Sequence, residues 1–360
     1  AMDIAAAVEG AGGTINAYTS KELTCYWNHL PAERLELAID VLADMLTASL
    51  LDPQEIDRER SVVQQEIRRT RDQPGAWVGE LLGRALFGDT PMGWPTAGNE
   101  ATVAALSRND FLHWLRTWYR PQNVVLSVAG NAGHEEVLAA ARRYLLEGEP
   151  QPLPAVVPVD SNLPAQRLAL EERDITQANL ALGLPSLSRR DPDRYALLVL
   201  NSILGRGMSS RLFKEVRERR GLAYSIGSMV HRYSDTGVLA IAAGVSPDQL
   251  GEAVRVILAE VRKLALEPPG DEELARARDY TIGTFRLSLE TPMALAQRAG
   301  ELLLTMGEIE RIDEAVEKMR AVGIQDTQRV AQRVLQLQKA TLAVVGPGLS
   351  EAELSELLEA

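Results

Sequence analysis

The sequence has almost no cysteine and no long hydrophobic run. Cys25 is the only cysteine among 360 residues, so no disulfide can form within the chain. No stretch reaches the roughly 18 uncharged apolar residues of a membrane-spanning helix, and no signal peptide is visible. A cytoplasmic location without a membrane span is therefore expected, and a periplasmic or secreted protein without disulfides stays open.

The chain also lacks an excess of positive charge. It has 38 Lys and Arg against 50 Asp and Glu, which gives a formal net charge of −12. The arginine-rich runs at 68–71 and 217–220 lie among acidic residues, so no basic stripe is available to bind a phosphate backbone. We therefore expect no nucleic-acid partner. The remaining composition, 46% apolar and 24% charged, is typical of a globular protein whose length suits two domains.

An internal repeat divides the chain into two similar halves. Asn123–Gly130 resembles Lys339–Gly346 at an offset of 216 residues. Pro53–Glu59 resembles Gly270–Arg276, and pairing Ile56 with Leu274 gives an offset of 218. Residues 123–130 and 339–346 each read as a buried strand that follows an amphipathic helix and ends in glycine. Because the two halves carry the same elements in the same order, we expect two homologous domains.

Five prolines between Glu147 and Pro164 predict an extended linker. The predicted domains are therefore 1–147 and 165–360, joined by a linker over 148–164. When the halves are aligned, the first lacks the counterpart of about 165–217, which includes two strands and a helix in the second half. We thus expect the first domain to be truncated at its N-terminus by roughly 50 residues in the chain as given.

Two hairpins are predicted, one in each half. Strands at 14–18 and 24–28 flank a polar turn, and so do strands at 224–231 and 237–243. Paired strands followed by paired helices indicate an α+β fold. In each of the two homologous domains we expect a mainly antiparallel sheet packed against helices.

A charged helix that begins at Pro53 carries two carboxylates on one side. Glu59 and Glu66 are seven residues apart, which corresponds to about two helical turns. The matching positions of the second half hold Ala277 and Thr284, which have no carboxylate. Taken alone, this pattern fits either an exposed charged face or a site present in only one half.

Four motifs give the chain its resemblance to a known family. They are Gly12–Glu22, Arg58–Ile67, Gly205–Phe213 and Arg217–Tyr224, and they occur in the family order over the whole chain. The chain resembles the M16 peptidases, the group of insulinase, pitrilysin and the mitochondrial processing peptidase, and is most similar to the short bacterial members. The resemblance implies a processing-peptidase-like fold and a zinc-dependent metalloendopeptidase that cleaves peptides enclosed between two domains.

The resemblance also implies roles for individual residues. Family members bind Zn²⁺ through an H-x-x-E-H helix and a downstream glutamate, which corresponds here to Glu66. Glu59 would orient the metal site. Arg217 and Tyr224 would bind the substrate around the scissile carbonyl. The strand that contains Asn16, Ala17 and Tyr18 would pair with the peptide substrate.

One departure from the family pattern is clear, because the chain contains no H-x-x-E-H. None of its four histidines, His29, His113, His134 and His231, has a second histidine four positions on. We expect the two histidine ligands upstream of Ala1, so that the chain as given is inactive. The alternative is a non-catalytic M16-like subunit, or a structural core subunit, that partners an active peptidase. A homodimer, or a heterodimer with a second M16-type subunit, is expected in either case.

Overall fold

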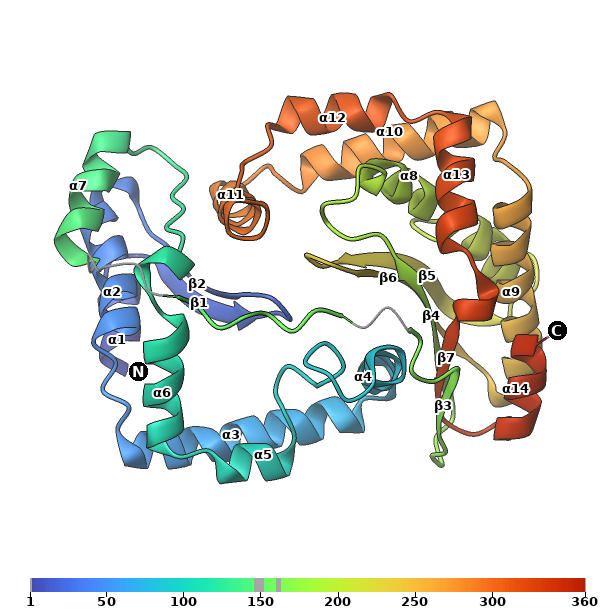
Figure 1. Cartoon of the computed structure of the whole chain (residues 1–360), viewed down its shortest axis with the longest axis horizontal. Coiled ribbons are helices and arrows are strands. Elements are labelled where there is room, and N and C mark those ends of the chain that lie inside the picture. The colour runs from blue at the N-terminus through green and yellow to red at the C-terminus, as the bar shows by residue number, and fades with distance from the viewer. Residues whose placement is uncertain (1, 146–151, 160–162, 360) are drawn as a thin grey trace. The chain divides into compact units, whose positions relative to one another are not determined.

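The computed structural model describes residues 2–145, 152–159 and 163–359 (Figure 1). Part of the predicted linker over 148–164 therefore lies outside the described residues. The chain forms two compact units. The first unit contains Ala1–Gln65, Thr96–Val156 and Leu287–Ile309, and the second contains Glu66–Pro95, Val157–Arg286 and Glu310–Ala360.

Each unit includes one helix from the other half of the sequence. Helix α4 (Pro74–Phe87) belongs to the second unit, and helix α11 (Pro292–Met306) belongs to the first. The two helices start 218 residues apart, which is the offset of the internal repeat. The halves therefore exchange equivalent helices. For this reason the compact units do not follow the predicted domain boundaries at 147 and 165.

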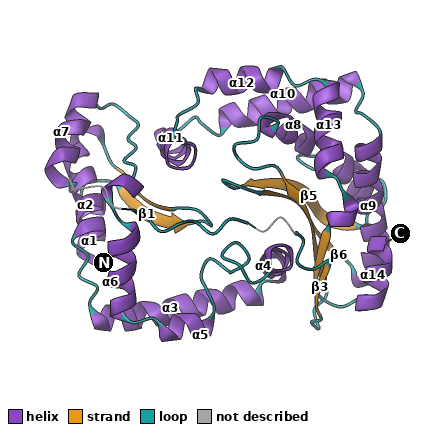
Figure 2. Ribbon diagram, viewed as in Figure 1, coloured by secondary structure: helices purple, strands orange, loops and turns teal. Residues whose placement is uncertain are grey.

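The second unit is built on a five-stranded sheet with the order β3-β7-β4-β6-β5. The strands are drawn in orange in Figure 2. Its strands are β3 (Leu168–Glu171), β4 (Ala178–Ser186), β5 (Ala223–Arg232), β6 (Gly237–Val245) and β7 (Thr341–Val345). Only β3 and β7 run parallel, and the other three pairs are antiparallel. The expected mainly antiparallel sheet and the hairpin formed by β5 and β6 are thus confirmed.

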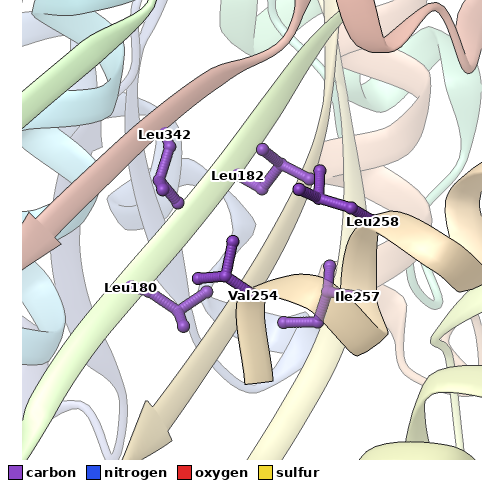
Figure 3. Close-up of a pocket in the computed structure, with 6 residues that line it drawn as sticks. All are labelled: Leu180, Leu182, Val254, Ile257, Leu258 and Leu342. Atoms are coloured by element: carbon purple, nitrogen blue, oxygen red, sulfur yellow. The ribbon is translucent and has the colours of Figure 1, made fainter. Parts of the chain in front are cut away.

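Successive side chains of β4 point to opposite faces of this sheet, and both faces are buried. Leu180, Leu182 and Leu184 face the main hydrophobic core. In Figure 3, Leu180 and Leu182 lie beside side chains of α9 (Leu250–Leu266), with Leu342 of β7 nearby. The helices that contribute buried side chains to this core are α8 (Arg194–Leu204), α9, α10 (Asp271–Leu287), α12 (Ile312–Arg320), α13 (Ile324–Val334) and α14 (Glu351–Glu359).

The opposite face of the same sheet is covered by α4. Val78, Leu82, Leu86 and Phe87 of this helix are buried against small and β-branched side chains of the central strands, which are Ala181, Val238, Ala343 and Val345. Small residues on the strands let the helix approach closely. A helix from the first half thereby completes the hydrophobic packing of the second-half sheet.

The first unit contains a two-stranded sheet and a set of helices. Strands β1 (Thr14–Thr19) and β2 (Thr24–His29) pair antiparallel from Thr14 opposite His29 to Thr19 opposite Thr24. This confirms the first predicted hairpin. Its helices, besides α11, are α1 (Met2–Gly10), α2 (Leu35–Thr47), α5 (Glu100–Ala105), α6 (Arg108–Trp118), α7 (His134–Tyr144) and the N-terminal part of α3 (Pro53–Asp72).

The prediction of a buried strand at 123–130 is wrong. Residues 124–129 belong to no strand, and Val124 and Val128 are 38% and 40% exposed. Their counterpart β7 is fully buried because it lies between β3 and β4. Within the described part of the first unit, no strands equivalent to β3 and β4 flank this segment, so its apolar pattern has no sheet to join.

No helix in the described part of the chain has the length and apolar character needed to cross a membrane. The short 3₁₀ turns are Ala32–Arg34, Pro121–Asn123, Pro247–Gln249 and Leu337–Lys339, and a π-helical turn spans Phe213–Glu218.

Candidate functional site

Helix α3 presents two carboxylates that no other described side chain neutralises. Its start is capped by Asp52, whose Oδ1 accepts hydrogen bonds from the backbone N–H groups of Gln54 at 2.9 Å and Glu55 at 3.2 Å. Glu59 and Glu66 are both exposed on the helix, without an ion pair to a described residue. Both carboxylates are therefore available to a ligand.

These two carboxylates do not make a zinc site by themselves. The described residues contain no group of three or more His, Cys, Asp or Glu side chains that could hold a metal ion. A catalytic zinc site needs three protein ligands beside its water. The donor set of the described residues thus falls short of a complete zinc site.

The predicted substrate strand β1 is exposed along most of its length. Asn16, Ala17 and Tyr18 all lie on its accessible part, and β2 is its only partner strand in the described regions. The Asn16 side chain accepts a hydrogen bond from the Ala17 amide at 2.8 Å. Burial, together with Cys25 and Glu301, raises the pKa of Tyr18 to about 12, so its phenol stays protonated at neutral pH.

Two backbone irregularities position Arg217 and Tyr224. Arg217 lies in the π-helical turn Phe213–Glu218, where the amide of Arg219 donates to the carbonyl of Lys214 at 2.9 Å. Tyr224 is the extra residue of a β-bulge at the start of β5, because the register passes from Ala223 to Ser225. Single π-turns and bulges are common where a side chain is aimed at a functional site.

The structure brings Arg217 and Tyr224 into direct contact. The guanidinium carbon of Arg217 lies 5.4 Å from the centre of the Tyr224 ring. It also lies 4.8 Å from the centre of the Phe213 ring, one π-turn earlier. Tyr224 is 81% exposed, so its ring and hydroxyl are open to a ligand.

The ion pairs around the π-helical turn do not involve the Arg217 side chain, which stays available to a ligand. Glu215 accepts from Arg219 Nη1 and from Arg220 Nη1, the latter at 2.6 Å. These hydrogen bonds, first among them that of Arg220, hold the pKa of the Glu215 carboxyl below its usual value. The Arg217 side chain forms no hydrogen bond or ion pair within the described residues. It therefore presents unpaired N–H donors next to an exposed phenol.

Sequence reasoning missed Phe213 as part of this group. The signal was their spacing, because two residues four positions apart lie on one side of a helical turn. For Glu59, Glu66 and the strand Asn16–Tyr18, the described contacts add no further partner that would define a site.

Comparisons with known proteins identify the family of the chain. Residues 1–100 match the family model described as insulinase (peptidase family M16), and residues 105–280 match the model of the peptidase M16 inactive domain. A protein of Streptomyces coelicolor named as an uncharacterized zinc protease is 37% identical, with 100% of this chain and 79% of that protein covered. A Bacillus subtilis protein of the same description is 33% identical, with 96% of this chain and 84% of that protein covered.

Solved structures show the same fold. A protease from Helicobacter pylori superposes with a TM-score of 0.87 at 22% identity, covering 96% of this chain and 85% of its own. A structure from Pseudomonas fluorescens, described as a peptidase M16 inactive domain, gives a TM-score of 0.82 at 18% identity, covering 96% and 84%. The resemblance predicted from four motifs is thereby confirmed, and the chain belongs to the M16 family of peptidases.

Proposed function

We propose that this protein is a zinc endopeptidase in which Arg217 and Tyr224 bind the substrate backbone beside the scissile carbonyl. The observation that carries the proposal is the contact between an unpaired guanidinium and an exposed phenol. It is supported by relatives that are named zinc proteases.

The chemistry of the two side chains suits this role. A guanidinium offers a rigid fork of N–H donors, and a phenol adds one O–H donor. When a peptide carbonyl becomes tetrahedral, its oxygen gains negative charge, and donors already aimed at that oxygen lower the barrier. Arg217 and Tyr224 therefore stabilise the transition state more than the bound peptide.

In the same proposal, helix α3 contributes to the zinc site. Glu66 would supply one zinc ligand, and Glu59 would orient that ligand; the two histidines would come from outside the described residues. Zinc, when bound, polarises the carbonyl and activates water. The exposed strand Asn16–Tyr18 would hold the peptide by main-chain pairing, a mode that tolerates many side chains.

The test is Tyr224→Phe in the protein expressed from its complete reading frame. We expect kcat on a fluorogenic peptide to fall by about 100- to 1,000-fold, the usual effect of removing one oxyanion donor. Zinc content and melting temperature should stay unchanged, because the ring is kept and the hydroxyl is exposed. Tyr280→Phe on α10 is the matched control, because Tyr280 is also partly exposed at 41%. Full turnover of Tyr224→Phe would reject the catalytic role.

A second function is favoured by one specific observation, the lack of H-x-x-E-H in these 360 residues. The alternative is a non-catalytic M16-like subunit that binds peptides or supports an active partner subunit. The two functions are distinguished by metal analysis and turnover of the complete protein. Stoichiometric zinc with turnover supports the endopeptidase, whereas peptide binding without zinc or turnover supports the subunit.

A further inference from the structure

We propose that Phe213 is a positioning residue that holds the Arg217 guanidinium in place for the substrate. The inference rests on the proposed function of Arg217 and Tyr224 and adds a third side chain to it. Phe213 touches neither substrate nor metal in this proposal, because it acts through Arg217.

The contact that carries the inference is a guanidinium close to two aromatic rings. Arg217 lies 4.8 Å from the Phe213 ring and 5.4 Å from the Tyr224 ring. Cations are attracted to aromatic faces over such distances. Phe213 is partly buried, whereas Tyr224 is 81% exposed. Phe213 is therefore the fixed face, and Tyr224 is the face that a substrate can reach.

The turn that carries Phe213 is anchored in the core. Leu212 and Val216 flank Phe213 in sequence and are completely buried. The π-helical turn places Phe213 and Arg217 on the same side of the segment, four residues apart. Because the backbone under Phe213 is fixed, its ring is a rigid support for a long side chain.

The neighbouring arginines show why such a support is needed. Arg211 is held by Glu273 through two hydrogen bonds, at 2.9 Å from Nε and 2.7 Å from Nη2. Arg219 and Arg220 are held by Glu215. Arg217 alone, among the arginines of segment 211–220, has no carboxylate partner within the described residues. Carboxylates orient the others, whereas the Arg217 guanidinium lies over the Phe213 and Tyr224 rings.

This arrangement has a functional advantage. A carboxylate partner would orient the guanidinium but would also occupy its N–H donors and cancel its charge. An aromatic face fixes the guanidinium plane and leaves the donors at its edge free for a carbonyl oxygen. Loss of the face should therefore reduce transition-state stabilisation without removing the charge.

The experiment is a double-mutant cycle in the protein expressed from its complete reading frame. Phe213→Leu should lower kcat about 5- to 30-fold with little change in KM, the effect expected from losing a cation–π contact. Phe213→Tyr, which keeps an aromatic face, should restore turnover. In the Arg217→Ala background, Phe213→Leu should have no further effect, because the residue it positions is absent.

The outcomes separate the two proposals. Full turnover of Arg217→Ala would reject the proposed role of Arg217 itself. A low turnover of Arg217→Ala combined with wild-type turnover of Phe213→Leu would overturn only the inference about Phe213. The same would follow if Phe213→Leu lowered kcat equally in both backgrounds, which is the result expected of a merely structural residue. Phe213→Met is run in parallel, with melting temperatures, in case the leucine variant does not fold.

Discussion

The packing of α4 on the second-half sheet predicts coupled stability effects at Leu82 and Gly183. Leu82 lies on α4 and is 5% exposed, and Gly183 lies in the middle of β4. A β-carbon added at Gly183 would lie 2.9 Å from Leu82 Cδ1 and 2.8 Å from Leu86 Cδ1. The absence of a side chain at Gly183 thus makes the room that the Leu82 side chain occupies.

The expected changes in the free energy of unfolding follow from this contact. Leu82→Ala should lower the free energy of unfolding by about 2–5 kcal/mol, as for other buried leucines. Gly183→Ala should lower it by about 1–3 kcal/mol through overpacking against two leucine methyl groups. In the double variant, the new methyl group at position 183 enters the space that Leu82 has left. The double variant should therefore lose less free energy of unfolding than the sum of the two single losses, by about 1 kcal/mol or more.

The measurement is urea unfolding of the four proteins at neutral pH, with midpoints and slopes compared. The control is Leu266→Ala on α9, where the side chain is 72% exposed and the change should stay within about 0.5 kcal/mol. Strictly additive costs at Leu82 and Gly183 would refute the reasoning, because they would mean that α4 does not pack on this strand.

The remaining predictions concern pH and metal. Trp77 Nε1 and Arg173 Nε donate to the Glu171 carboxylate at 2.6 Å and 2.8 Å. Burial opposes these hydrogen bonds, yet the pKa of Glu171 is lowered overall, so its stabilisation is present at neutral pH and lost on acidification. Glu171→Gln should therefore destabilise the protein at pH 7, and in urea titrations the difference should shrink as the pH falls below the usual range of a glutamate carboxyl; a constant difference would contradict this. The 360-residue chain alone should bind Zn²⁺ weakly in chelator competition, and stoichiometric tight zinc would oppose that expectation. In the complete protein, Glu66→Gln should weaken zinc binding by about 10-fold or more, whereas Glu59→Gln should reduce turnover more than zinc content.

Local patterns in the sequence were sufficient for most elements. The helix predicted to begin at Pro53 matches α3, and the strands predicted at 224–231 and 237–243 differ from β5 and β6 by at most two residues at either end. Both hairpins are confirmed as well. These elements were predictable because hydrophobic periodicity and turn residues act within a few positions. The family, too, was recognisable from four short motifs.

The candidate site was predictable only in part. The motif Arg217–Tyr224 indicated two functional residues, but it did not show the Phe213 ring against the guanidinium. Phe213 and Arg217 share a π-turn, and Tyr224 lies in a bulge where β5 pairs with β6. Backbone irregularities of this kind arise from packing between elements, so hydrophobic periodicity does not show them.

The sequence by itself determined which segments become helices and strands, and which family the chain resembles. The tertiary structure decided which surfaces those segments cover. The apolar pattern of 124–129 predicted a strand, yet no neighbouring strands take it up in the described part of its unit. Helix α4 has an apolar face that must be covered, and only the fold directs it to a sheet from the other half of the chain. The physical reason is that burial is non-directional, so a local pattern specifies that a face must be covered but not by which segment.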